Sequence, residues 1–134
     1  MTVLVDTNVL LDVFTGDPVW SEWSLSQLNG LALSDDLVIN DVIFAELAPA
    51  FERFEELDRA VDQMRLSILP FSRSALYLAG RVHQRYRREK SGTKDGVLPD
   101  FFIGAQAAVE SMHLLTRDAR RFRTYFPKLA LITP

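Results

Sequence analysis

The stretch Thr2-Val3-Leu4-Val5-Asp6-Thr7-Asn8 joins a short apolar run to three polar residues. A run that ends abruptly in a polar turn is typical of a buried strand in a parallel sheet. Apolar residues resume at once in Val9-Leu10-Leu11, which favours a helix that leaves directly from the turn. A strand that passes straight into a helix is the first half of a β-α-β unit, so this segment predicts an α/β fold.

The alternation of strand and helix continues along the chain. Short apolar runs predict four further strands, at 37–39, 67–69, 114–115 and 129–132. Helices are expected from Pro18 to Asn29-Gly30, from Asn40 or Asp41 to Pro49, over 51–65, from Ser74 with Leu76, Ala79, Val82 and Tyr86 on one face, from Asp100, and over 119–126. Residues 89–98 are predicted to form a loop. These elements predict a three-layer α/β/α domain with a mostly parallel central sheet of about five strands.

The composition suits a single domain. The chain has 134 residues, of which 48% are hydrophobic, so residues 1–134 are expected to share one core. The absence of cysteine excludes disulfides, thiolate metal sites and cysteine nucleophiles. No apolar run approaches the roughly 18 to 20 residues that span a bilayer, and Asp6 interrupts the apolar start before a signal peptide can form. We therefore expect a cytoplasmic protein with no membrane partner.

Charge is distributed unevenly along the chain. Residues 1–64 hold 2 basic and 13 acidic residues, a net charge of −11, whereas residues 65–134 hold 13 basic and 5 acidic residues, a net charge of +8. Arg81, Arg85 and Arg88 recur at helical spacing and form a basic stripe. Further basic residues extend it: Arg87, Lys90, Lys94, Arg117, Arg120, Arg121 and Arg123. These residues either bind the phosphate backbone of RNA or form a solvated surface.

Four acids fall where a parallel sheet binds ligands. They are Asp6 after the first strand, Glu46 within two turns of the second, Asp100 at the start of a helix and Asp118 after the fourth strand. Because ligands bind beyond the carboxyl ends of such strands, we expect the four side chains to converge. Clustered carboxylates need a cation, and oxygen ligands without His or Cys favour Mg²⁺ or Mn²⁺, which can activate water to attack a phosphodiester. Taken singly, each acid can equally cap a helix or face solvent.

Four motifs follow one another along the chain. They are Val5-Asp6-Thr7-Asn8-Val9-Leu10, Ala45-Glu46-Leu47, Leu98-Pro99-Asp100-Phe101-Phe102-Ile103-Gly104-Ala105 with Ala107, and Leu115-Thr116-Arg117-Asp118 with Phe122. This ordered set resembles the PIN-domain ribonucleases of the VapC toxin type. The resemblance spans nearly the whole chain. One departure is Asp41, where the family often has a small hydroxyl residue that opens the helix of Glu46; an aspartate caps a helix equally well.

The resemblance implies an α/β/α fold and a Mg²⁺- or Mn²⁺-dependent endoribonuclease that is the toxin of a type II toxin-antitoxin pair. By position, the family's acidic quartet, which is both catalytic and metal-binding, corresponds to Asp6, Glu46, Asp100 and Asp118. The polar residues that accompany the first and last acids correspond to Asn8 and Thr116, which support the site. The implied partners are RNA, an antitoxin and a second copy of the chain, in a homodimer or a larger assembly. A basic side chain of the antitoxin would block the site by pairing with its acids.

Two alternatives stay open. One is a catalytically inactive PIN-like module that binds RNA and protein through its basic and acidic halves. The other is a receiver domain or haloacid-type phosphatase, which also places acids at strand ends. The second is weakened because Thr7-Asn8 follows Asp6 where those proteins have an Asp-x-Asp nucleophile motif. His83 and His113, the two histidines, have no metal-ligand spacing and are expected to be structural or surface residues.

Overall fold

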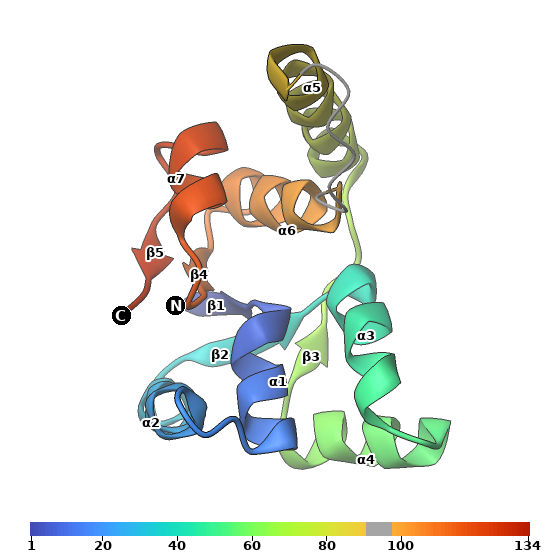
Figure 1. The fold of residues 1–134 in the computed structure, drawn as a ribbon, viewed down its shortest axis with the longest axis vertical. Helices are drawn as coiled ribbons and strands as arrows, with labels where there is room; N and C mark the ends of the chain where they lie inside the picture. The colour runs from blue at the N-terminus through green and yellow to red at the C-terminus, as the bar shows by residue number, and fades with distance from the viewer. Residues whose placement is uncertain (91–97) are drawn as a thin grey trace.

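The computed structural model describes residues 1–90 and 98–134 and contains one five-stranded sheet (Figure 1). The strands are β1 (Thr2–Val5), β2 (Asp36–Ile39), β3 (Ser67–Ile68), β4 (His113–Leu115) and β5 (Leu131–Ile132). Their order across the sheet is β3-β2-β1-β4-β5, and each neighbouring pair is parallel. The predicted α/β class is confirmed, and the sheet is parallel throughout.

Helices fill the connections between the strands. They are α1 (Thr7–Thr15), α2 (Ser21–Ala32), α3 (Asp41–Leu47), the 3-10 turn η1 (Ala48–Ala50), α4 (Phe54–Gln63), α5 (Arg73–Lys90), α6 (Leu98–Val109) and α7 (Arg120–Tyr125). With right-handed crossovers, the strand order puts α1 to α4 on one face of the sheet and α5 to α7 on the other. Figure 1 shows the first group in the lower half of the molecule and the second in the upper half. Among the described residues, no helix is long and apolar enough to cross a membrane.

The first strand lies in the middle of the sheet, which explains its continuous apolar sequence. Val3, Leu4 and Val5 are fully buried, as expected for a parallel strand covered on both faces. The chain turns into α1 at Asp6, whose side chain accepts a hydrogen bond from the backbone N–H of Thr7. The helix ends at Gly16, where a φ of +65° favours glycine. This strand-turn-helix unit positions the first acid of the candidate site.

Several predicted boundaries were wrong by a turn or less. Pro18 precedes α2, because the carboxylate of Asp17 accepts hydrogen bonds from the backbone N–H groups of Val19 and Trp20 and holds a turn there. Asn29-Gly30 lies inside α2, which continues to Ala32. The predicted helix over 51–65 is shorter, at 54–63. Of the loop predicted at 89–98, residues 89 and 90 belong to α5 and residue 98 to α6, and residues 91–97 lie outside the described residues.

The buried face of α5 also differs from the prediction by one position. Ala75, Ala79, Val82 and Tyr86 are buried, whereas Leu76 is 42% exposed. The four buried residues are spaced by four, three and four positions, which keeps them on one side of a helix. This side packs on α6, so α5 and α6 form the main helix pair on their face of the sheet.

Close packing occurs where α6 meets the segment after α7. A methyl group on the α-carbon of Gly104 would lie 2.4 Å from the ring of Phe126, which is itself buried. Only a residue without a side chain leaves room for that ring at this distance. Gly104 therefore lets α6 come close to the segment after α7.

We predict that Gly104→Ala lowers the free energy of unfolding by about 1–3 kcal/mol, because the ring of Phe126 must move inside a packed core. Urea unfolding monitored by circular dichroism measures the change. The matched control is Gly80→Ala in α5, where the added methyl group meets nothing within 4 Å and should raise stability by up to about 1 kcal/mol. Equal effects of the two variants would contradict the packing argument.

Candidate functional site

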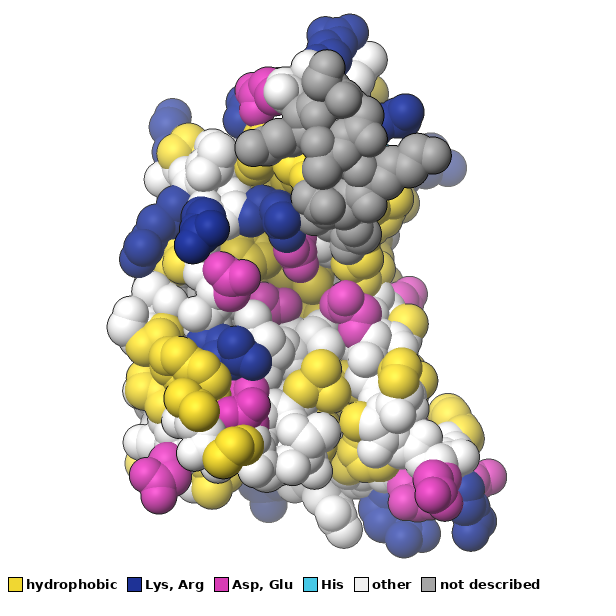
Figure 2. All heavy atoms as spheres, in the orientation of Figure 1, with side chains coloured by type: hydrophobic (Ala, Val, Ile, Leu, Met, Phe, Trp, Pro, Cys, Tyr) yellow, Lys and Arg dark blue, Asp and Glu magenta, His cyan; other side chains and the backbone are white. Residues whose placement is uncertain are grey.

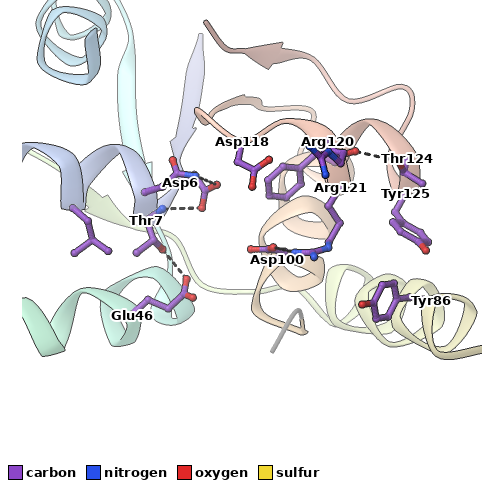
Figure 3. Close-up of a pocket in the computed structure, with 13 residues that line it drawn as sticks. Asp6, Thr7, Glu46, Tyr86, Asp100, Asp118, Arg120, Arg121, Thr124 and Tyr125 are labelled. Carbon is purple, nitrogen blue, oxygen red and sulfur yellow. Dashed lines mark hydrogen bonds and ion pairs between the residues drawn. The ribbon is translucent and has the colours of Figure 1, made fainter. Parts of the chain in front are cut away.

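The four acids selected from the sequence line one pocket at the carboxyl-terminal edge of the sheet (Figure 3). The cavity has a volume of about 770 Å³. Its acids come from four places in the chain: Asp6 at the end of β1, Glu46 in α3, Asp100 in the first turn of α6 and Asp118 between β4 and α7. The predicted convergence of the four side chains is therefore what the structure contains.

Asp6 is the most buried of these acids. Its Oδ1 accepts a hydrogen bond from the backbone N–H of Thr7 at 2.8 Å, and its Oδ2 accepts one from the hydroxyl of Thr116 at 2.7 Å. Burial raises the pKa of Asp6 to about 7; the hydroxyl of Thr116 acts in the opposite direction, and the nearby charge of Asp100 adds to the increase. In the absence of a cation, this carboxyl therefore takes up a proton near neutral pH.

Asn8 and Thr116, predicted as supporting residues, surround this carboxylate. The amide nitrogen of Asn8, Nδ2, donates hydrogen bonds to Asp6 Oδ2 and to Thr116 Oγ1, each at 3.3 Å. The backbone N–H of Asp118 donates to Thr116 Oγ1 at 3.2 Å. The first turn of α1 is thus hydrogen-bonded to the loop that carries Asp118.

Thr7 connects two of the acids, which the sequence analysis did not predict. Its backbone N–H donates to Asp6, and its hydroxyl donates to Glu46 Oε1 at 2.7 Å. Burial raises the pKa of Glu46, while the hydrogen bond from Thr7 acts against that increase. The position of Thr7 next to Asp6 was the available signal, but its second contact depends on where α3 packs.

A buried amide pair sets α3 against α6. Asn40, whose side chain caps α3 by accepting from the Ile43 N–H, donates from its amide to Gln106 Oε1 at 2.9 Å. Gln106 in turn donates to the backbone oxygens of Leu69 and Pro70, after β3. Because Glu46 and Asp100 lie on these two helices, this pair helps to fix their separation. Sequence analysis missed Gln106, because its hydrogen-bond partners lie far away in the sequence.

Asp100 forms an ion pair with an arginine inside the pocket. Arg121 Nη1 lies 2.5 Å from Asp100 Oδ2. Burial raises the pKa of Asp100, and Arg121 opposes that increase through its hydrogen bond and its charge. Figure 3 shows Arg121 between the acids and a second end of the pocket where Tyr86 and Tyr125 lie. The cavity therefore has an acidic end, a cation in its middle and an aromatic end.

The basic residues predicted to bind RNA are not all placed alike. Arg81, Arg85 and Arg88 are exposed on α5, and Arg85 lies over the Tyr125 ring with its Cζ 5.0 Å from the ring centroid. Arg117 is directed to Asp12 in α1, with Nε 2.8 Å from Asp12 Oδ2. In the described part of the chain, the arginines that line the pocket are Arg120 and Arg121, and Lys94 lies outside the described residues. Figure 2 shows basic atoms over α7 directly beside acidic atoms.

The donor chemistry of the pocket suits a hard divalent cation. All four acids offer oxygen ligands, and burial makes ionisation costly for three of them, Asp6, Glu46 and Asp100. Within residues 1–90 and 98–134, no three His, Cys, Asp or Glu side chains are close enough to enclose one ion. Mg²⁺ commonly binds through one or two carboxylates and keeps several waters, so the arrangement fits a partly hydrated ion.

Comparisons with known proteins give one family and one group of folds. The model of the PIN domain family matches residues 3–127. Similar solved structures include VapBC2 from Rickettsia felis bound to a promoter DNA fragment (21% identity, TM-score 0.74, covering 100% of this chain and 99% of that chain). VapBC-1 from nontypeable Haemophilus influenzae gives 20% identity, a TM-score of 0.71 and coverage of 99% and 98%. FitAcB from Neisseria gonorrhoeae gives 21% identity and a TM-score of 0.68, covering 97% of this chain and 96% of that chain. No curated protein matches the chain.

We predict that the metal-free protein loses stability as the pH rises from 5 to 8. The pKa of Asp6 is about 7 in the folded chain against an ordinary 3.8, so the folded state binds this proton more tightly than the unfolded chain does. The contribution of this proton to the free energy of unfolding is present in full below pH 4. It is lost as the pH rises through 7, and the whole loss is up to about 4 kcal/mol. Urea unfolding in EDTA at several pH values measures the slope.

Two variants separate Asp6 from the other titrating groups. Asp6→Asn should flatten this pH dependence, because it removes the buried proton site. Asp41→Asn, a change at an exposed residue in the first turn of α3 outside the pocket, should leave the slope as it is. A slope that is the same in Asp6→Asn and in the unaltered protein would contradict the assignment.

Proposed function

Because the chain belongs to the PIN domain family, we propose that it is a metal-dependent endoribonuclease and the toxin of a type II toxin-antitoxin pair. The observation that carries the proposal is the pocket in which carboxylates from β1, α3, α6 and the loop after β4 face one another. A nuclease of this kind needs no protein nucleophile, in agreement with a chain that lacks cysteine. The single domain predicted for residues 1–134 would act in the cytoplasm, where its RNA substrate is.

The proposed roles follow from the contacts of each residue. Asp6, Glu46, Asp100 and Asp118 are the catalytic acids and would hold Mg²⁺, or Mn²⁺ in its place. When bound, the cation supplies activation of water and charge neutralisation for hydrolysis of a phosphodiester. Asn8 and Thr116 orient the carboxylate of Asp6 through their hydrogen bonds to Oδ2. A cation would stabilise the ionised form of Asp6 most, because Asp6 is the most buried of the four acids.

The RNA backbone would enter past the arginines at the pocket. Arg120 is exposed at the rim, and Arg121 lies deeper, where it neutralises Asp100. A guanidinium can donate two hydrogen bonds to one phosphate, which suits both residues to this role. Arg81, Arg85 and Arg88 remain further candidates from the sequence, whereas the side chain of Arg117 is engaged with Asp12. Arg85 contacts the ring of Tyr125, which lines the pocket, and we assign the more distant phosphates to the α5 stripe.

The proposed partners are an antitoxin and a second copy of the chain, as a homodimer or within a larger assembly. The structural neighbours include VapBC2, VapBC-1 and FitAcB, and this supports an antitoxin as a partner. The Arg121–Asp100 ion pair demonstrates that a guanidinium fits among these acids. A basic side chain of the antitoxin would use the same chemistry to block the pocket.

One observation favours a second candidate function, an inactive PIN-like module that binds RNA or protein. Asp100 is already paired with Arg121, and in the described residues no three acids surround a common point closely enough for one ion. A module of this kind would keep the basic surface and lose hydrolysis. The two candidates differ in whether RNA is cut.

We predict that the antitoxin-free protein cuts cellular RNA at discrete positions in Mg²⁺ or Mn²⁺ and not in EDTA. Asp6→Asn and Asp100→Asn should each lower the rate at least about a hundredfold, because loss of an outer-shell partner alone costs about 10–100-fold in comparable sites. A time course of cleavage measures the rate, and sequencing of the new RNA ends identifies the target.

Asp41→Asn is the matched control, since it removes an exposed acid from the helix that carries Glu46 and should cleave at the normal rate. Intact RNA under every metal, with tight RNA binding, would favour the inactive module. Cleavage that persists in both acid variants would show that another site or a contaminating nuclease is responsible.

We also predict that Arg120→Ala weakens RNA binding more than Arg81→Ala does, because Arg120 lines the pocket and Arg81 is on the α5 stripe. Loss of one phosphate contact should reduce the slope of log K against log salt by about 0.7 for a single strand. Fluorescence anisotropy with the Asp6→Asn protein as background avoids RNA hydrolysis. An equal or larger effect of Arg81→Ala would locate the main contact on α5.

A further inference from the structure

An ion pair between Asp12 and Arg117 lies outside the pocket, and neither residue is among the proposed catalytic acids. Asp12 in α1 is 2% exposed, and both of its carboxylate oxygens accept from Arg117 Nε, at 2.8 and 3.1 Å. The hydroxyl of Ser24 in α2, also buried, donates to Asp12 Oδ2 at 2.8 Å. Removing one partner of such a pair leaves an uncompensated charge in the interior, so the two side chains depend on each other.

The guanidinium of Arg117 is held on further sides. Its Cζ lies 5.6 Å from the centre of the Trp20 ring, in a cation-π contact. The pKa of Asp17 is lowered mainly by the two backbone hydrogen bonds that this carboxylate accepts, and the charge of Arg117 adds to that decrease. Only 30% of the side chain is exposed. Asp12 and Trp20 thus contact a planar cation that a lysine would not replace, and Ser24 holds the carboxylate of Asp12. The side chain of Arg117 is therefore engaged with α1 and with the residue before α2, and it is not among the residues that line the pocket.

The backbone of Arg117 lies between two residues of the candidate site. Thr116 donates its hydroxyl to Asp6, and the Asp118 N–H donates to Thr116 Oγ1. The Arg117 N–H itself donates to Asn8 Oδ1 at 3.3 Å. Thr116 and Arg117 are therefore hydrogen-bonded to Asp6 and Asn8 at the start of α1, and Asp118 is linked to them through Thr116.

The two attachment points of Arg117 are one helical turn apart on the same face of α1. Asn8, which receives the backbone N–H, and Asp12, which receives the side chain, are four positions apart and therefore neighbours on the helix surface. One attachment would leave the loop free to pivot about that contact. Two attachments along the helix axis fix its direction as well as its position.

We propose that Arg117 is a positioning residue, whose ion pair with Asp12 fixes the 116–118 loop on α1 and so holds Thr116 and Asp118 in register with Asp6. The inference rests on the proposed function, since it concerns the geometry of the proposed metal site. It assigns Arg117 to the architecture of the site and removes it from the surface that contacts RNA. Asp12, Ser24 and Trp20 then affect the reaction without touching substrate.

The test compares Arg117→Ala, Asp12→Ala and the double variant in two measurements. The first is the Mg²⁺ concentration that gives half of the metal-induced rise in Tm, without RNA. The second is kcat and KM for RNA cleavage. We expect each single variant to need about 10–100-fold more Mg²⁺ and to lose kcat with KM little changed, and the double variant to be no worse than the singles. Arg117→Lys should recover only part of the loss.

A variant that is merely unstable is recognised by a matched control. Leu28→Ala truncates a buried side chain of α2 and should cost about 2–5 kcal/mol of stability without moving the Mg²⁺ midpoint. If Arg117→Ala does not fold, Arg117→Lys and Asp12→Asn carry the same comparison.

Three outcomes would overturn the proposal. An unchanged Mg²⁺ midpoint in the Arg117 and Asp12 variants, with metal binding and cleavage normal in the unaltered protein, would remove the positioning role alone. A raised KM and a smaller salt slope in Arg117→Ala but not in Asp12→Ala would make Arg117 an RNA contact. If the unaltered protein shows neither Mg²⁺ stabilisation nor cleavage, the proposed function fails and the positioning role fails with it.

Discussion

The carboxylate of Asp6 is buried at the end of a strand that is covered on both faces, and charge is costly there. Three hydrogen-bond donors partly offset this cost: the Thr7 N–H, the Thr116 hydroxyl and the Asn8 amide. Those donors still leave the pKa near 7, so the site is poised to gain stability from a cation. Much of the remaining architecture serves to bring other carboxylates to this point.

The other acids reach Asp6 through separate polar contacts. Glu46 and Asp100 are set by the buried Asn40–Gln106 pair between α3 and α6, and Glu46 is also tied to Thr7. The loop with Asp118 is held on α1 by Asn8 and by the Arg117–Asp12 ion pair. Directional contacts in a packed interior specify positions more narrowly than apolar burial does, which is what a site built from four elements requires.

The sequence was sufficient to predict the class of fold and the acids of the pocket. Strand ends in a parallel sheet share an edge, so an acid after a short apolar run can be located without coordinates. The partners of those acids were harder, because the second contact of Thr7 and the roles of Gln106 and Arg117 depend on helices far away in the chain. Arg117 was grouped with the surface arginines because nothing in its neighbourhood in the sequence indicates a buried aspartate 105 residues earlier. Local errors, such as Leu76 for Ala75 on the buried face of α5, arose because positions three and four before Ala79 both lie on its side of the helix, and the larger apolar residue was chosen.

The central place of β1 has a consequence for how the protein is made. Its neighbour β4 is encoded near the other end of the chain, and the hydrogen bond from Thr116 to Asp6 spans 110 residues. Such long-range parallel pairing forms late, after loops of many residues have closed. A ribosome that has translated through α6 has produced Asp6, Glu46 and Asp100 but neither Thr116 nor Asp118. The pocket therefore assembles only when translation has passed the fourth strand, and a truncated product carries most of the acids without the means to align them.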